Sequence, residues 1–510
     1  MLITFFIDVG VIIDRQQAME MRDIDYYEVR ARDVKSADIT SCEGNAEILQ
    51  QLRDQDTSLE VLNISDHAFV IGEGDDLGWL GYFIGKSKYL EQLRIRSWGE
   101  GENIEAFMEE INHNRSINSL YIGTNLGGVS FRNLCPFFRN NNNRLAQLEL
   151  DHFEVGLECA QSIAFVLGES QYYSLTTLRL EGCNLSDEGF AGIATALRTH
   201  PQLESLYLEG NNIGLMGCIA LADMLRGWGT SNLKTLDLDG NGIDDQGLQA
   251  LAAGMTNTKL EALYLSDNLI TGVGLRSFST YFQSESCCLN TLFLYRVNFG
   301  DEGAVALADG LMGNKSLKCL DFDPDESGIT GVGWAAFSKV LCDPTSINNT
   351  YHSNHSIVMI GDNLDSTPLD IREYLDLNEC PHPAIYKMLE SHSDLDMNPF
   401  FQWKLKLLPV VINWFRSASS GMMHVNYPQE ESTQRQNLQS RELSALYKFV
   451  RGMPALTVVA YWQQQVINIQ ARRRRLDVEE ETAWVRLGGR PRDEGNVEFI
   501  QIGTKRMRQE

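Results

Sequence analysis

The sequence LESLYLEGNN, residues 203–212, returns three more times in this chain: as LTTLRLEGCN at 175–184, LKTLDLDGNG at 233–242 and LEALYLSDNL at 260–269. Each copy begins L-x-x-L-x-L and has Asn or Cys three positions after its last leucine. Successive copies start 28, 30 and 27 residues apart. A repeat of this length is typical of a solenoid, in which each copy folds into the same unit and stacks on the next.

One copy predicts a short strand followed by a helix. Leu206 and Leu208 alternate with outward positions, as in a strand. In GCIALADMLRGW, residues 217–228, apolar side chains recur at near-helical spacing. We therefore expect parallel strands on one side of the solenoid and helices on the other. Each buried leucine contributes roughly 1.5–3 kcal/mol, so a single unit cannot offset its ordering entropy and several must stack.

The Asn or Cys of each copy predicts a buried ladder. At this position of the repeat the side chain points inward, where an amide can bond the backbone of neighbouring turns. A buried amide without partners would cost roughly 1–3 kcal/mol. The four ladder residues are Cys183, Asn211, Asn241 and Asn268.

The same motif extends in both directions from these four copies. Regular copies begin at Leu59, Leu90, Ile117, Leu145, Leu289 and Leu317, and a worn copy is expected near Ile347. The motif L-x-x-L-x-L-x-x-N/C, its period of 27–31 residues and helical segments such as GAVALADGLMG at 303–313 resemble the ribonuclease-inhibitor class of leucine-rich repeats, over about Leu59 to Asp343. That resemblance implies a right-handed α/β horseshoe, with a parallel sheet on the concave face and helices on the convex face. It also implies a protein-binding scaffold.

The periodicity changes after Ile357, where helical patterns begin. The segment DMNPFFQWKLKLLPVVINWF at 396–415 resembles a tail found behind such repeats in families of single-celled algae, which carry no known activity. An open solenoid end must be covered by an apolar face, so we favour a capping role over a separate functional domain. The predicted parts are an N-terminal lead-in and cap at 1–58, the solenoid at 59–356, a helical C-terminal cap at 357–425, a linker at 426–440, a helical segment at 441–485 and a disordered tail at 486–510.

The composition narrows the classes of partner. The net charge of −26 and the pI near 4.8 argue against nonspecific binding to nucleic acid, which needs a basic face. Ten cysteines without a C-x-x-C pattern favour a reduced, cytoplasmic protein. The start MLITFFIDVGVII lacks a basic region and contains Asp8, so we do not expect a signal peptide, and no apolar run is long enough for a membrane span. The run Arg472–Arg475 leaves a nuclear address as an alternative, although Glu479–Glu481 close behind favour a solvated charged helix.

Three short motifs fail as ligand sites. GYFIGKSK at 81–88 has Leu80 where a phosphate-binding loop needs glycine. DLDGNGIDDQGL at 237–248 ends in Leu248, where a calcium loop needs a bidentate carboxylate, and DFDPDESG at 321–328 has Glu326 in place of the required glycine. No nucleophile or metalloprotease motif is present, and His352 with His355 makes only a loop pair. We therefore expect no enzyme activity, no cofactor, no metal site and no catalytic residue.

The strongest functional signal is the set of outward strand residues. The residue between the last two leucines of each copy, and the residue two positions further on, form two columns that should line the concave face. Exposed aromatic side chains on such a face often anchor interfaces, although outward strand positions also favour Tyr and Phe for packing alone. The predicted partner-binding residues are Tyr121, Glu149, Asp151, Glu181, Tyr207, Glu209, Asp237, Asp239, Tyr264, Phe293, Tyr295, Asp321 and Asp323.

Our leading hypothesis is a non-enzymatic scaffold whose acidic, aromatic concave face binds a basic protein surface. The alternative is a regulator of a small GTPase, because one family of GTPase activators has the same repeat type; a stimulated-GTPase assay separates the two. A third role, the receptor half of an immune switch, is disfavoured because no nucleotide-binding motif is found. The sequence predicts neither the identity of the partner nor the oligomeric state.

Overall fold

The computed structural model describes residues 25–392 except for short internal gaps. The described ranges are 25–65, 69–72, 75–96, 101–102, 104–123, 137, 144–152, 156–168, 174–198, 200, 202–227, 232–361, 366–380 and 383–392. Residues 1–24 of the predicted lead-in and cap at 1–58 lie outside them. So do the C-terminal cap beyond residue 392, the linker, the helical segment at 441–485 and the tail.

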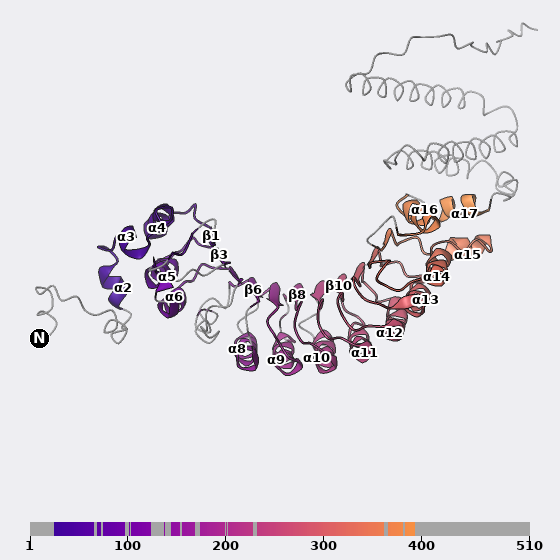
Figure 1. Cartoon of the computed structure of the whole chain (residues 1–510), viewed down its shortest axis with the longest axis horizontal. Helices are drawn as coiled ribbons and strands as arrows, with labels where there is room; N and C mark the ends of the chain where they lie inside the picture. Colours follow the sequence, from indigo (N-terminus) through magenta and orange to yellow (C-terminus); the bar gives the residue numbers. More distant parts are fainter. Residues whose placement is uncertain are drawn as a thin grey trace, which may run out of the picture. The chain divides into compact units, whose positions relative to one another are not determined.

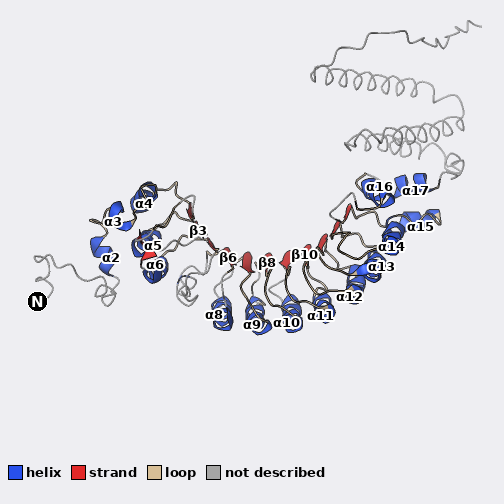
Figure 2. Ribbon diagram, viewed as in Figure 1, coloured by secondary structure: helices blue, strands red, loops and turns tan. Residues whose placement is uncertain are grey.

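The described repeats form one parallel sheet of 11 strands in which spatial order follows chain order. Figure 1 and Figure 2 show the strands of the central repeats along the inner side and the helices along the outer side. The sheet is open, and it confirms the predicted leucine-rich repeat solenoid. Its strands are β1 (Val61–Ile64), β3 (Gln92–Ile95), β5 (Ser119–Ile122), β6 (Gln147–Asp151), β7 (Thr177–Glu181), β8 (Ser205–Tyr207), β9 (Thr235–Asp237), β10 (Ala262–Tyr264), β11 (Thr291–Phe293), β12 (Cys319–Asp321) and β13 (Met359–Ile360).

The leucines of successive copies lie side by side across the sheet. Leu206 of β8 is in register with Leu178 of β7 and Leu236 of β9, and all three are fully buried. Since the same position recurs in each strand, one buried row runs through all repeats. The prediction that a worn copy of the repeat starts near Ile347 is wrong in its position. A helix begins there, and the last strand of the sheet is β13, with the buried Ile357 just before it.

One helix follows each strand of the central repeats. Several of these helices begin with a side chain that accepts a hydrogen bond from the first turn, such as Ser186, Asp244 and Thr330. The outer helices are α5 (Leu77–Lys86), α6 (Ile104–Ile111), α8 (Gly156–Gly168), α9 (Asp187–Leu197), α10 (Leu215–Leu225), α11 (Asp245–Gly254), α12 (Gly272–Phe282), α13 (Gly300–Leu311) and α14 (Gly331–Leu341). No helix among the described residues is long and apolar enough to span a membrane.

A row of aspartates on the helical side links each repeat to the next. The Asp301 carboxylate, at the start of α13, accepts hydrogen bonds from the backbone N–H of Thr330 at 2.8 Å and of Gly333 at 2.9 Å in the following repeat. Asp187 and Asp245 bind the next helix start in the same way. These aspartates satisfy backbone donors that a helix N-terminus leaves open, so they hold neighbouring helices in a fixed register.

The predicted asparagine ladder is present. Asn211 donates through Nδ2 to the Leu180 carbonyl at 2.7 Å and to the Leu208 carbonyl at 2.9 Å, and its Oδ1 accepts from the Leu185 N–H at 3.0 Å. Asn241 and Asn268 repeat these bonds one and two turns further on. Cys183 takes the same place, with its thiol directed to the Leu150 carbonyl.

Replacing Asn211 with alanine is expected to lower the free energy of unfolding by about 1–3 kcal/mol, because two buried carbonyls and one N–H lose their partner. The midpoint of urea denaturation measures this effect. The exposed neighbour Asn212, changed to alanine, serves as the control and should change stability by less than about 0.5 kcal/mol. Equal midpoints for the two variants would contradict a stabilising ladder.

A second asparagine motif, N-x-S followed by Ile or Leu, closes the turn before a strand. Asn114, Asn314 and Asn354 are all buried. Asn354, for example, donates to the Leu311 carbonyl at 2.9 Å and accepts from the Ser356 N–H at 2.8 Å. These three residues form part of N-glycosylation-type sequences, but their side chains are structural and enclosed.

The end of the described solenoid is covered by three helices, α15 (Ile347–His352), α16 (Leu369–Asn378) and α17 (Pro383–Ser391). Lys387 of α17 is fully buried and donates to the carbonyls of Leu341 at 2.6 Å and Asn354 at 2.9 Å. Asn378 donates to the Ile357 carbonyl at 2.6 Å. These two side chains bond backbone carbonyls of the last repeats, so α16 and α17 cover the end of the described solenoid.

The other end is closed by α2 (Asp25–Arg30), α3 (Ser36–Ile39) and α4 (Asn45–Asp54), within the predicted N-terminal cap. The buried Asp75 carboxylate fixes this cap to the first repeat. It accepts from Thr40 Oγ1 at 3.0 Å, from the Ser41 N–H at 3.0 Å and from the Gly72 N–H at 2.8 Å. Asp75 belongs to β2 (Asp75–Asp76), which pairs with β4 (Gly101–Glu102) in a small parallel sheet of its own.

Candidate protein-binding face

The outward strand residues form the continuous columns that the repeat predicts. Tyr207 lies beside Asp237 in the sheet register, Asp237 beside Tyr264, and Tyr264 beside Phe293. The register continues to Asp321 on β12 and, in the other direction, through Arg179 and Glu149 to Tyr121. The predicted residues of the first column therefore lie on adjacent strands, about 5 Å apart from one strand to the next.

Arg179 is bound within this face. Its guanidinium forms an ion pair with Glu181 on the same strand and lies 3.7 Å from the Glu149 carboxylate on β6. Its Cζ lies 3.9 Å from the centre of the Tyr207 ring. Burial raises the pKa of Glu181, and Arg179 opposes that rise. Because Glu149 and Glu181 share one internal cation, Arg179 offsets one of their two negative charges in the free protein.

Glu209, Asp237 and Asp239 form the acidic part of the face next to Arg179. Among the residues described by the structure, no Lys or Arg side chain forms an ion pair with these three carboxylates. Asp237 is only 8% exposed, so it is not the exposed charge that an outward strand position suggests. Its Oδ1 accepts from the Asp239 N–H at 3.0 Å, and Asp239 Oδ1 accepts from the Ser266 N–H at 2.6 Å.

Burial and mutual repulsion change the acidity of this pair. Burial, and after it the neighbouring Asp237 carboxylate, raise the pKa of Asp239 to about 7, although the hydrogen bond from the Ser266 N–H opposes this rise. Burial also raises the pKa of Asp237. A positive group placed beside the pair would reverse both shifts, because an opposite charge favours the ionised form.

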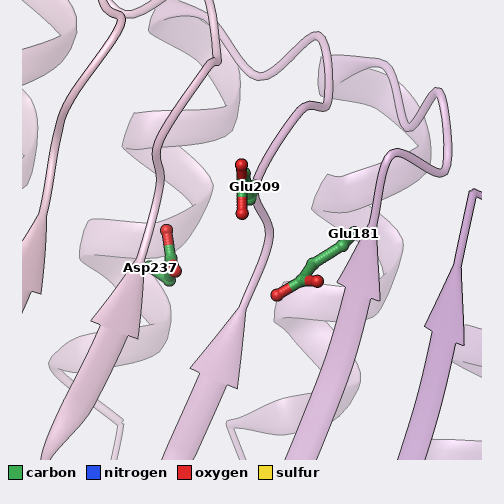
Figure 3. Close-up of side chains that lie close together, drawn as sticks. All are labelled: Glu181, Glu209 and Asp237. Carbon is green, nitrogen blue, oxygen red and sulfur yellow. The ribbon is translucent and has the colours of Figure 1, made fainter.

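Carboxylate oxygens of Glu181, Glu209 and Asp237 lie within 4.8 Å of one another. Figure 3 shows the three side chains on three neighbouring repeats. They are close enough to share one cation. Arg179 is already bonded to Glu181, so positive charge is present at one side of this cluster. The cluster therefore does not alter the expectation of no metal.

Aromatic side chains follow the acidic part. The rings of Tyr264 and Phe293 are stacked, with centroids 4.4 Å apart and planes 11° apart. Tyr295 is exposed in the second column, and Arg296 lies 5.4 Å from its ring centre. This stack is half-buried, so it presents a rigid apolar surface beside the carboxylates.

The outer members of the predicted set have local partners. The Tyr121 hydroxyl donates to Asp151 Oδ2 at 3.1 Å, which joins β5 to β6. Asp323 accepts from the backbone N–H of Asp325 at 2.8 Å and so shapes its own turn. Asp321 lies in register with Phe293 on β12. The structure therefore brings together Tyr207, Glu209, Asp237, Asp239, Tyr264 and Phe293 as one central patch, and the other predicted residues lie to either side of it.

Sequence reasoning missed the role of Arg179. It was one of the outward column residues but was not included among the partner-binding ones. The signal was present in the strand itself: Arg179 and Glu181 stand two positions apart and so share one face of the sheet. Tyr207 follows in register on the next strand.

Asp239→Asn is expected to gain stability relative to the unchanged chain as the pH rises from about 4 to 8. The folded pKa of Asp239 is raised from 3.8 to about 7, so between these values the folded state holds a proton that the unfolded state has released. The stabilising protonation is complete below pH 3.8 and is lost as the pH rises through about 7. Asparagine keeps the acceptor for Ser266 but does not ionise.

Urea denaturation of both proteins across this pH range measures the difference. Asp223→Asn, which removes an exposed carboxylate from α10, is the control and should track the unchanged chain. A constant difference between Asp239→Asn and the unchanged chain from pH 4 to 8 would contradict the raised pKa.

Comparison with known proteins agrees with this architecture. Residues 174–194, 199–222, 231–252 and 256–279 match the leucine-rich repeat family. The chain is 29% identical over 217 residues to mouse "NACHT, LRR and PYD domains-containing protein 14", which is 42% of this chain and 21% of that protein. Its human counterpart is 31% identical over 204 residues, 40% of this chain and 18% of that protein. Pig ribonuclease inhibitor is 26% identical over 201 residues, 39% of this chain and 43% of that protein.

The chain thus spans less than half the length of each of these relatives. The likeness supports leucine-rich repeats similar to those of ribonuclease inhibitor, as the sequence predicts.

Proposed function

We propose that this leucine-rich repeat chain is a non-enzymatic scaffold that binds a basic protein surface through the central patch of its concave face. The observation that carries the proposal is the register of Tyr207, Asp237, Tyr264 and Phe293 on four adjacent strands, with Glu209 and Asp239 beside them. Aromatic anchors supply most of the binding energy in many interfaces, and complementary charge sets encounter rate and specificity.

The charge of the chain supports a basic partner. Residues 470–510 carry 10 Lys and Arg against 8 Asp and Glu, a net charge of +2. Because the whole chain carries −26, residues 1–469 carry a net charge of −28. The repeats hold most of this acid, and Glu209, Asp237 and Asp239 are the central part of it that no described basic side chain neutralises. The similarity to repeats of ribonuclease inhibitor and the NACHT proteins supports the interaction role only at the level of the fold.

A matched pair of charge reversals tests the proposal. The full chain serves as bait in a lysate of its native cells, and bound proteins are eluted with increasing salt. Glu209→Lys on the concave face should lose the captured partner, whereas Asp223→Lys on α10 should retain it, since both positions are exposed and each change adds two positive charges. Retention by Glu209→Lys together with loss by Asp223→Lys would place binding on the helical side and overturn the proposal.

A further inference from the structure

The face already shows how it binds a guanidinium. Arg179 lies over the Tyr207 ring, with Cζ 3.9 Å from the ring centre, and its charge is met by Glu181 and Glu149. A flat cation on this sheet is therefore held by a ring on the next strand and by carboxylates on either side of it. Arg179 is the chain's own occupant of that arrangement.

Two strands further on, similar surroundings recur, and no Lys or Arg in the described part of the chain forms an ion pair with the carboxylates there. Asp237 occupies the column position on β9 that Arg179 occupies on β7. It is flanked in register by Tyr207 on one side and Tyr264 on the other. Phe293 is stacked on the far face of Tyr264, so the near face of that ring is turned toward β9. Glu209 and Asp239 supply two more carboxylates.

Asp237 has an unused acceptor at this place. The residue is 8% exposed, its Oδ1 is taken by the Asp239 N–H, and Oδ2 accepts no hydrogen bond from any described residue. On a side chain this enclosed, an oxygen without a protein donor depends on little water, so its desolvation is only partly compensated. A donor that arrives with a partner would meet this need, and a cationic donor would meet it best.

The spacing fits one flat cation. Tyr207 and Tyr264 are two strands apart, roughly 9–10 Å, so a cation midway lies about 5 Å from each and within the roughly 6 Å range of cation–π attraction. Arginine suits the place better than lysine because its planar guanidinium can stack on a ring and donate to carboxylates at the same time.

We propose that the space between Tyr207 and Tyr264, above Asp237, receives one arginine side chain of the partner. The inference rests on the proposed function, in that it names the partner group which the central patch binds. The guanidinium stacks against Tyr264 or Tyr207 and donates to Asp237 Oδ2 and to Glu209 or Asp239.

Small arginine derivatives test the site without knowledge of the partner. N-acetyl-L-arginine amide is titrated into the full chain and followed by saturation-transfer NMR, with N-acetyl-L-citrulline amide as the neutral isostere and N-acetyl-L-lysine amide as the point-charge comparison. The arginine derivative should bind saturably, at least about tenfold more tightly than either of the others.

Variants of the full chain locate the binding. Asp237→Asn and Tyr264→Ala should each weaken arginine binding by about tenfold, whereas Tyr264→Phe, which keeps the ring, should retain it. Asp223→Asn removes one exposed charge from α10 on the helical side and should leave binding unchanged. Unchanged melting curves for the near-isosteric Tyr264→Phe, Asp237→Asn and Asp223→Asn variants establish that these comparisons report binding and not unfolding.

Three outcomes would overturn the inference: equal binding of arginine and citrulline derivatives, binding of the lysine derivative as tight as that of arginine, or equal loss in Asp237→Asn and Asp223→Asn. The first excludes a charge site, the second excludes a flat-cation site, and the third leaves only the general negative charge of the chain. Failure here with partner capture still lost in Glu209→Lys would spare the proposed function. Arginine binding with capture unaffected by Glu209→Lys would instead remove the proposed function and keep the site.

Discussion

Replacing Leu206 with alanine is expected to lower the free energy of unfolding by about 2–5 kcal/mol. Leu206 is fully buried and lies between Leu178 and Leu236 in the continuous row of strand leucines. Alanine removes three carbon atoms from a row whose backbone spacing is fixed by the sheet, so the repeats on either side cannot close the cavity. The loss therefore includes both the transfer free energy of the missing atoms and the cost of the cavity.

Urea denaturation followed by far-ultraviolet circular dichroism measures this loss, provided that the slope of the transition is compared as well as its midpoint, because repeat arrays can unfold in more than one step. Ser205→Ala in the same strand is the control: its side chain is half-buried on the other face of the sheet and should change stability by less than about 0.5 kcal/mol. If the two variants unfold at the same urea concentration, the leucine row does not stabilise the solenoid in the way described.

Replacing Tyr264 with alanine is expected to speed dissociation of a captured partner by about 30-fold, which corresponds to about 2 kcal/mol of binding free energy. Tyr264 is stacked on Phe293 and lies next to Asp237, so its ring is already oriented before binding. A preorganised ring loses little conformational freedom on binding, and its removal should act mainly on the dissociation rate.

Surface-based kinetics with the captured partner measure both rate constants. Tyr264→Phe keeps the stack and is the matched control, and it should dissociate at close to the rate of the unchanged chain. Thermal melting establishes that Tyr264→Ala remains folded. A dissociation rate for Tyr264→Ala equal to that of Tyr264→Phe would mean that the ring is not an anchor.

The double change Asp237→Asn and Asp239→Asn separates charge from contact at the same patch. It should slow association, mainly at low salt, where exposed charges are weakly screened. Asp237 and Asp239 do not both act as full negative charges at neutral pH. Burial is the main cause that raises the pKa of Asp239 to about 7, so this carboxylate is partly protonated there. The slowing should therefore be larger at pH 8 than at pH 6.

The repeat made much of the fold predictable. Strands stack in register, so a fixed period converts sequence positions directly into spatial neighbours. For that reason the leucine row, the inward Asn211, Asn241 and Asn268, and the order of the outward columns could all be predicted. The position of the last strand was wrong because the final copy has only Ile357 and Ile360 where leucines usually stand, and a helix begins at Ile347 instead.

The central patch depended on more than the period. Sequence determined that Tyr207, Asp237 and Tyr264 would be adjacent, because backbone pairing is set by the repeat. Only the tertiary structure decided that Arg179 pairs with Glu181 and lies near Glu149, while Asp237 is enclosed and only its Oδ1 accepts a hydrogen bond from a described residue. Side-chain pairing depends on rotamers and on local desolvation, which vary from one repeat to the next.

At the ends of the solenoid, too, some features followed from the sequence and others only from the folded structure. The sequence by itself determined that helices would cover the last repeat, since an exposed apolar end is unfavourable and the helical pattern follows directly. It did not reveal that the N-x-S sequences at Asn114, Asn314 and Asn354 form buried turns. Nor did it reveal that Lys387 donates hydrogen bonds to two backbone carbonyls of the last repeats. Those contacts join residues 33 and 46 positions apart, and no periodicity links them. The period could predict what recurs in each repeat, whereas contacts made once at an end were decided by the folded packing around them.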